Sequence, residues 1–303
     1  MIITKTPFRV SFFGGGTDYP AYFKENGGAV LATSIDKYCY ISTRYLPPFF
    51  GIKSRIVWSY IELVQKIDEI KHPAVRRCLE FLKIEKGVEM LHTGDLPARS
   101  GLGSSSTFTV GLLNSLSALL GKMVSKMQIA KDAIYVEQEL IKENVGCQDQ
   151  ILASFGGFNV IEFKQNGDFG ISPVIMDKER LEFLKKHMML FFTGFSRIAS
   201  EIAGEQIKKI PKKKEELKTM HQMVYEGVKI LNSKTDIKEF GKLLNESWKL
   251  KRSLSDKIST PEVDEVYSAA LKSGAVGGKL LGAGGGGFML LFVPPEVQES
   301  MKS

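Results

Sequence analysis

Cysteine is scarce in this sequence. The 303 residues include three cysteines, Cys39, Cys78 and Cys147, and no two of them form a Cys-x-x-Cys pair. Their odd number and wide spacing argue against a disulfide framework and against a zinc site, and are typical of reduced thiols. We therefore expect a cytoplasmic protein.

Long hydrophobic runs are also lacking. No run approaches the roughly 18 apolar residues that a membrane-spanning helix needs. The first residues, MIITKTPFRVSFFGGG, contain no uninterrupted apolar stretch of signal-peptide length and no small-residue cleavage site. We expect neither a membrane partner nor export.

The net charge is +7, with 41 lysines and arginines against 34 acidic residues. Such an excess fits either a nucleic-acid surface or a protein that handles small anions. Much of it lies in KKIPKKKEELK (208–218), where interleaved glutamates are typical of a solvated helix end. Few aromatic residues stand beside these lysines, so a stacking platform for bases is not indicated. We expect no nucleic-acid partner; salt-sensitive RNA binding without ATP turnover would favour the opposite interpretation.

The chain does have an ordinary globular composition, 43% hydrophobic and 25% charged, and a length suited to about two domains. Strand patterns dominate residues 1–60, and helical periodicity follows in IELVQKIDEI (61–70) and HPAVRRCLEFL (72–82). After a further strand come two apolar-faced helices, and a strand–glycine–strand unit closes the chain at 275–293. This mixture predicts an α+β fold with domains at 1–166 and 167–303.

Glycine clusters near residues 101 and 282 raise the possibility of a dinucleotide fold. GAGGGG (282–287) matches G-x-G-x-x-G, but the apolar run after it predicts a strand where that fingerprint needs a helix. GLGSSS (101–106) does precede a helix, but Ser106 replaces the third glycine. No acidic residue lies between Asp95 and Asp132, so the carboxylate expected to bind the ribose is missing. The dinucleotide interpretation therefore fails.

A Walker A loop fits no better, because GAVGGKL (274–280) is one residue too short and ends in Leu280. GLGSSS is better explained by the helix that follows it. A helix start exposes about four unpaired N–H groups and a partial positive charge. Glycines let the backbone approach a phosphate, and hydroxyls can reach its oxygens or a magnesium ion. A capped helix after a flexible turn is the simpler alternative.

Three motifs stand in order along the chain: PFRVSFFGGGTD (7–18), LPARSGLGSSST (96–107) and LLGAGGGGFMLL (280–291). Together they resemble the galactokinase, homoserine kinase, mevalonate kinase and phosphomevalonate kinase (GHMP kinase) family over essentially the whole chain. The resemblance implies a ribosomal-S5-like N-terminal domain, a ferredoxin-like C-terminal domain, and an ATP-dependent small-molecule kinase that uses Mg²⁺. It implies that the second motif binds the ATP phosphates through Pro97, Gly101, Leu102, Gly103, Ser104, Ser105 and Ser106.

The resemblance also implies catalytic residues. Asp149 in ENVGCQDQ matches the family's catalytic aspartate, which can accept or orient the proton of the attacking hydroxyl. Arg9 matches the first-motif arginine, which can stabilise charge on the phosphoryl group. Ser105 and Glu137 are the implied magnesium ligands. Without the family, Asp149 would be a loop or cap residue and Glu137 an exposed helix charge.

The first motif points to a sugar kinase. Galactokinases place Glu-His before its Thr-Asp pair, whereas this chain has Gly15 and Gly16 there, so the resemblance is strongest to the heptose-phosphate kinases of the family. We expect a sugar phosphate to be phosphorylated at its anomeric hydroxyl, with fucokinase- and galactokinase-like enzymes as alternatives. The expected substrate-binding residues are Gly15, Gly16, Thr17, Asp18 and Arg197, with Lys251, Arg252 and Lys279 as weaker candidates for the distant phosphate.

Overall fold

The computed structural model describes residues 1–194 and 199–302, and the contacts within it define two compact units. The first unit comprises Met1–Arg9, Ser34–Ala98 and Gly103–Gly156. The second comprises Val10–Thr33, Arg99–Leu102 and Gly157–Ser303. The expected domains, 1–166 and 167–303, divide the chain at a single point, and that division stays a prediction.

Strands β3 (Ser54–Val57), β4 (Ile61–Val64) and β5 (Val88–Gly94) belong to the first unit. Strand β3 pairs antiparallel with β4 and parallel with β5, and β5 pairs antiparallel with the last residues of β2 (Gly28–Tyr45). Strand β1 (Ile2–Phe13) also pairs with β2. These pairings confirm the strand prediction for this part of the chain. β-Branched and aromatic residues favour strands because they fit a half-buried pleated surface.

The structure contradicts the helix that the sequence predicted for residues 61–70. The predicted helix there is replaced by strand β4 and a short 3₁₀ turn, Ile67–Glu69. In β4 exposed residues, Ile61 and Leu63, alternate with buried ones. This period of two is that of a strand, and pairing with β3 outweighs the weak helical periodicity of so short a segment.

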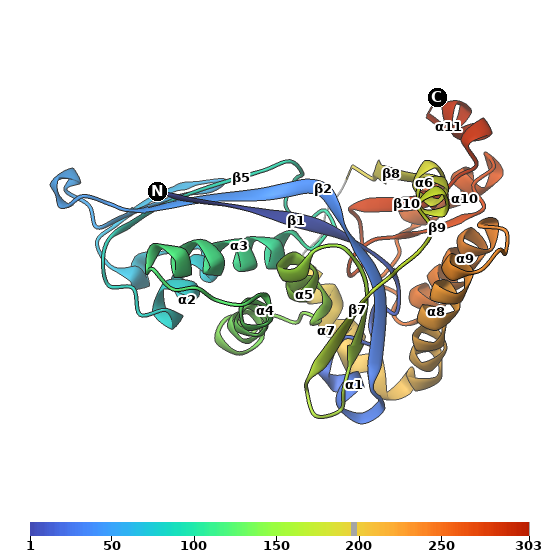
Figure 1. Cartoon of the computed structure of the whole chain (residues 1–303), viewed down its shortest axis with the longest axis horizontal. Helices are drawn as coiled ribbons and strands as arrows, with labels where there is room; N and C mark the ends of the chain where they lie inside the picture. Colours follow the sequence, from blue (N-terminus) through green and yellow to red (C-terminus); the bar gives the residue numbers. More distant parts are fainter. Residues whose placement is uncertain (195–198, 303) are drawn as a thin grey trace. The chain divides into compact units, whose positions relative to one another are not determined.

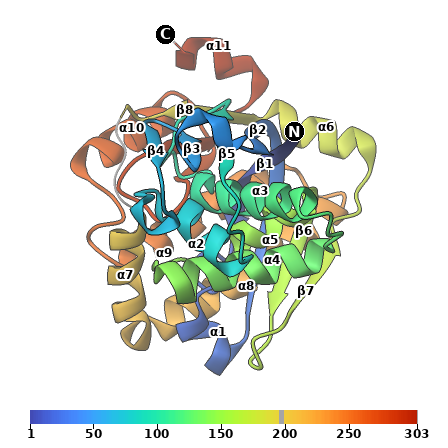
Figure 2. The same cartoon turned by 90° about the vertical axis from the view of Figure 1, so that its left-hand side faces the viewer.

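The helices of the first unit gather on one face of its strands (Figure 1). Helix α3, the predicted helix after the second motif, lies between the strands and α4, and is buried on most sides (Figures 1 and 2). Helix α4 ends in a π-helical turn, Val136–Ile141, before the chain reaches α5. The helices are α2 (Pro73–Phe81), α3 (Ser104–Leu119), α4 (Lys126–Tyr135) and α5 (Gln148–Phe155).

The second unit contains a hairpin and a separate small sheet. Strands β6 (Phe158–Phe163) and β7 (Phe169–Pro173) extend the pairing of the first residues of β2. Strands β8 (Met188–Phe192), β10 (Phe288–Phe292) and β9 (Gly277–Leu280) form an antiparallel sheet in that order. The strand–glycine–strand prediction at the end of the chain is therefore confirmed.

Helices α8 and α9 run side by side in the second unit, and α9 packs against β9 and β10 (Figure 1). The fully buried indole of Trp248 lies in the hydrophobic core of this unit. The helices are α1 (Pro20–Asn26), α6 (Lys178–Lys186), α7 (Ala199–Lys209), α8 (Lys214–Asn232), α9 (Lys238–Ser253), α10 (Pro261–Lys272) and α11 (Gln298–Lys302).

The lysine-rich segment 208–218 spans the end of α7, a 3₁₀ turn and the start of α8. Lys208 pairs with Glu205, and Lys213 with Glu216, each three residues away. These are solvated helix ends, as the interleaved glutamates indicated. Among the described residues, no helix is both long and apolar enough to span a bilayer.

Candidate active site

Helix α3 begins without a side-chain cap in the described part of the chain. Its N-cap is Gly103, in the left-handed conformation with φ +76°, and its first turn carries no acidic residue. The residue at the N-cap position therefore supplies no side-chain hydrogen bond, which argues against the simpler interpretation of a capped helix after a flexible turn. The N–H groups and partial positive charge of this helix start suit an anionic ligand.

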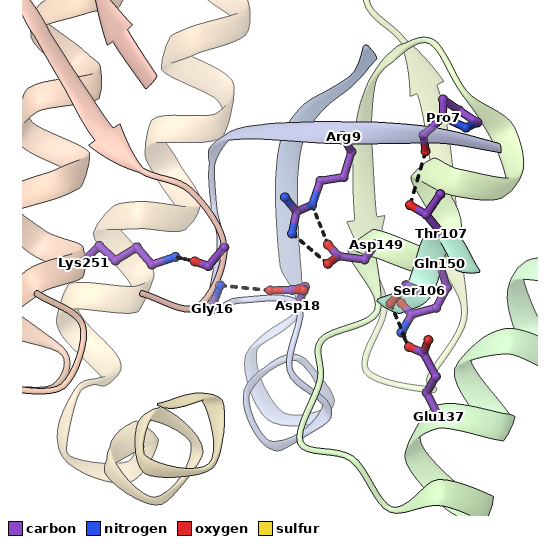
Figure 3. Close-up of polar contacts among 11 residues, drawn as sticks. Pro7, Arg9, Gly16, Asp18, Ser106, Thr107, Glu137, Asp149, Gln150 and Lys251 are labelled. Atoms are coloured by element: carbon purple, nitrogen blue, oxygen red, sulfur yellow. Dashed lines mark hydrogen bonds and ion pairs between the residues drawn. The ribbon is translucent and has the colours of Figure 1, made fainter. Parts of the chain in front are cut away.

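Arg9 and Asp149 form a two-bonded ion pair within the first unit (Figure 3). Arg9 Nε and Nη2 donate to Oδ1 and Oδ2 of Asp149, both at 2.7 Å. Arg9 lies on β1 and its side chain is 5% exposed, whereas Asp149 lies in the first turn of α5 and is 23% exposed. Such a planar fork is among the strongest and most directional ion pairs, so the carboxylate is held in one orientation but stays reachable.

The Arg9–Asp149 ion pair lies beside Gly103, at the start of α3. A Cβ atom on Gly103 would lie 3.2 Å from Arg9 Cγ and 3.2 Å from Asp149 Oδ2. The carboxylate of Asp149 therefore stands beside a guanidinium and a helix N-terminus, both of which favour negative charge. A carboxylate and a positive charge beside a helix N-terminus suit phosphoryl transfer to a hydroxyl group.

Glu137 lies in the π-helical turn, a geometry that is frequent at functional sites. Its carboxylate is fully buried, and Oε2 accepts hydrogen bonds from Ser106 Oγ at 2.8 Å and Gln150 Nε2 at 2.5 Å (Figure 3). Burial raises the pKa of Glu137 to about 7, and hydrogen bonds from neighbouring side chains oppose this only in part. Oε1 has no hydrogen-bond partner among the described residues. A carboxylate with one unpartnered oxygen near a hydroxyl fits the oxygen ligands that Mg²⁺ prefers.

The serines of the second motif differ in their surroundings. Ser105 is exposed, whereas Ser106 is buried and makes the contact with Glu137. Gln150, which bonds to the same oxygen, carries no sequence signal for this role, because its partner lies on another element. Pro97 is exposed and Leu102 is fully buried.

The glycine loop of the first motif belongs to the second unit. Gly16 N–H donates to Asp18 Oδ1 at 2.9 Å (Figure 3). Thr17 Oγ1 donates to the carbonyls of Gly14 and Ala29, both at 2.8 Å. Thr17 therefore fixes the shape of the loop from within. Asp18 does not cap α1, whose N-cap is Tyr19.

The third motif supports part of the second motif within the second unit. Phe288 N–H donates to the carbonyl of Ser100 at 2.9 Å, and the backbones of Gly101 and Gly282 lie in close contact. Lys251 Nζ in turn donates to the carbonyl of Gly282 at 2.6 Å (Figure 3). Strand β10 follows directly, which confirms that GAGGGG is not a dinucleotide fingerprint.

The basic residues expected to bind the second phosphate of the substrate differ in their surroundings. Arg197 lies outside the described residues. Arg252 pairs with Asp264 at 2.7 Å, and Lys279 donates from a buried position to the carbonyl of Phe12 at 2.9 Å. Arg252 and Lys279 thus each have a role within the second unit itself.

Comparison with known proteins places the chain in a family. Residues 66–157 match the N-terminal domain of GHMP kinases, and residues 228–303 match their C-terminal domain. The chain is 32% identical to a D-glycero-α-D-manno-heptose 7-phosphate kinase of Campylobacter jejuni, over 97% of this chain and 90% of that one. It is 30% identical to a mevalonate kinase of Pyrococcus abyssi, over 79% and 69%.

A solved structure of a D-glycero-D-manno-heptose 1-phosphate kinase from Bacteroides thetaiotaomicron has a similar fold. Its TM-score is 0.77 at 26% identity, with 99% of this chain and 91% of that chain covered. The chain therefore belongs to the GHMP kinases, an ATP-dependent family, and has their two-domain α+β fold. The expectation drawn from the three motifs is confirmed at this level.

Proposed function

We propose that the protein transfers the γ-phosphoryl group of ATP to the anomeric hydroxyl of D-glycero-D-manno-heptose 7-phosphate, giving the 1,7-bisphosphate. Similarity to the Campylobacter kinase over 97% of the chain supports the substrate class. The observation that carries the reaction type is the Arg9–Asp149 pair beside the start of α3. The reaction is phosphoryl transfer to an alcohol group.

In this proposal Asp149 accepts the proton of the attacking hydroxyl or orients it, because its carboxylate is held in place yet partly exposed. Arg9 holds that carboxylate with two hydrogen bonds and contributes positive charge where negative charge develops. The ATP phosphates lie at the start of α3, bound by the loop from Pro97 to Ser106.

Glu137 would hold Mg²⁺ together with a serine of the second motif. We propose Ser105, which is exposed in the first turn of α3, while Ser106 holds the Glu137 carboxylate. Mg²⁺, when bound, neutralises charge on the phosphates of the nucleotide. Oε1 of Glu137, which has no hydrogen-bond partner within the described part of the chain, supports this assignment.

The sugar phosphate is assigned to the first motif and to Arg197. Gly15 and Gly16 stand where galactokinases have a bulkier pair, Asp18 is buried and supplies a carboxylate for the sugar hydroxyls, and Thr17 holds the loop in shape. Arg197 is the proposed partner of the 7-phosphate, since a guanidinium can bind phosphate through two hydrogen bonds.

One assay tests this proposal against its nearest alternatives. ADP release would be measured with heptose 7-phosphate, unphosphorylated heptose, fucose, galactose and mevalonate. We expect the highest kcat/KM with heptose 7-phosphate. A preference for fucose or galactose would overturn the heptose assignment and leave another sugar kinase of the family, whereas no turnover of any acceptor would contradict the kinase proposal.

A further inference from the structure

Two side chains of the first unit donate to one and the same oxygen of Glu137. Ser106 and Gln150 both reach Oε2, and all three side chains are buried (Figure 3). Oε1 has no hydrogen-bond partner among the described residues. The two donors therefore fix the rotation of the carboxylate from its Oε2 side, and the Thr109 side chain, with Ser106 and Gln150, helps to lower the pKa of this buried group.

Gln150 follows Asp149 directly in the first turn of α5. Successive side chains on a helix point about 100° apart, so neighbours reach different elements. Asp149 reaches Arg9 on β1, whereas Gln150 reaches Glu137 in the π-helical turn. One rigid helical turn thus sets the places of two carboxylates, that of Asp149 and that of Glu137.

A second glutamine braces the π-helical turn without touching the carboxylate of Glu137. Gln138 Nε2 donates to the carbonyl of Val145 at 2.9 Å and contacts Cys147 Sγ at 3.4 Å. It has the same side chain, stands next to Glu137 in the sequence and holds the loop before α5. Gln138 therefore offers a matched control for the loss of a glutamine hydrogen bond.

We propose that Gln150 is a positioning residue for the bound metal: it orients the Glu137 carboxylate toward Mg²⁺ and ties that carboxylate to the helical turn of Asp149. This inference rests on the proposed role of Glu137 as a magnesium ligand. Gln150 acts through Glu137, as partners of metal ligands commonly do. Ser106 shares the task because it holds the same oxygen.

The test is a calorimetric measurement of nucleotide affinity, which does not depend on turnover. A non-hydrolysable ATP analogue is titrated into each variant with Mg²⁺ and again with EDTA. For Gln150→Met, which keeps side-chain length but removes the amide, we expect about 10-fold weaker binding with Mg²⁺ and unchanged binding with EDTA. Gln138→Met should lose much less Mg²⁺-dependent affinity than Gln150→Met, because Gln138 makes no hydrogen bond to the carboxylate of Glu137 among the described contacts. Equal behaviour of these two variants would overturn the inference.

A double-mutant cycle that combines Ser106→Ala with Gln150→Met provides a second test. Because both donors hold one oxygen, the Mg²⁺-dependent loss of the double variant should differ from the product of the two single losses. Strictly multiplicative losses would contradict a shared positioning role. Should Gln150→Met fail to fold, Gln150→Asn, whose amide is one methylene too short to reach, carries the same expectation.

Glu137→Gln distinguishes a failure of the proposed magnesium site from a failure of the proposed role of Gln150. If Glu137→Gln leaves binding with Mg²⁺ unchanged, the metal assignment in the proposed function fails and the role of Gln150 fails with it. If Glu137→Gln weakens binding with Mg²⁺ but Gln150→Met does not, the inference about Gln150 alone is overturned.

Discussion

Gly101 and Gly282 lie backbone against backbone within the second unit. A Cβ atom on Gly282 would stand 2.7 Å from the Cα of Gly101, closer than real Cβ contacts allow. Both glycines also have positive φ, +81° at Gly101 and +77° at Gly282. The third motif therefore meets the second through a contact that only glycine permits, and the loop that precedes α3 depends on it for its shape.

Gly282→Ala should therefore both destabilise the protein and raise the KM for ATP. A positive φ costs a non-glycine residue roughly 1–2 kcal/mol, and the contact with Gly101 adds about 1–3 kcal/mol of crowding. Gly121→Ala is the control, because Gly121 has φ +70° but no atom of the described residues would lie within 4 Å of an added Cβ. Denaturant unfolding and ATP kinetics would be compared. A Gly282 variant no less stable than the Gly121 variant would show that the contact does not matter.

Asp149→Asn is expected to fold and still bind ATP but to lose most turnover. Asparagine keeps the shape of the side chain, while the proton acceptor is lost; positioned proton transfer is typically worth about 10² to 10⁴ in rate. Circular dichroism, ATP titration and kcat would be measured on the same preparation. A fall in kcat of less than about tenfold would remove Asp149 as the base.

Arg197→Ala tests the charge of the acceptor. A charge-assisted contact contributes roughly 1.5–3 kcal/mol, so the KM for heptose 7-phosphate should rise about ten- to a hundredfold. Residual activity on unphosphorylated heptose and the KM for ATP should hardly change, since neither ligand presents a 7-phosphate. A wild-type KM for the phosphorylated sugar would exclude Arg197 from the site.

His72 should make folding sensitive to acid. Its ring stacks on Phe108 and meets Trp58 edge-on in the first unit, and burial lowers the pKa of His72 to about 4 from 6.5. The unfolded chain therefore takes up this proton first as the pH falls. The resulting loss of stability begins near pH 6.5, reaches about 2 kcal/mol at pH 5, and levels off below the folded-state pKa.

His72→Phe keeps an aromatic ring at this position but removes the titrating group. We expect its free energy of unfolding to fall less than that of the wild type between pH 7 and pH 5, as measured by urea unfolding at each pH. His92, whose pKa is also lowered by burial, remains in both proteins, and its charge contributes to the lowered pKa of His72. Parallel profiles for the two proteins would contradict the assignment.

Several features of this protein follow from residue order alone. The strand after GAGGGG was predictable because six successive apolar residues, 288–293, are bounded by glycine and proline, and this argued against a dinucleotide site before any fold was known. The family followed from three motifs in a fixed order. Glycine runs, apolar periodicity and motif order are local properties of the chain, so they can be read without knowing how its elements pack.

Other features depend on packing. Residues 61–64 become a strand because β3 offers an edge to pair with, although their own periodicity suggested a helix. Glu137 receives its hydrogen bonds from Ser106, which was not the serine singled out as a metal ligand, and from Gln150, which no motif marked. A hydrogen bond between two elements depends on their distance and rotation in the fold, and the spacing of residues along the chain does not encode either. The motifs therefore identified the catalytic family, while only the tertiary structure decided which neighbours hold its carboxylates in place.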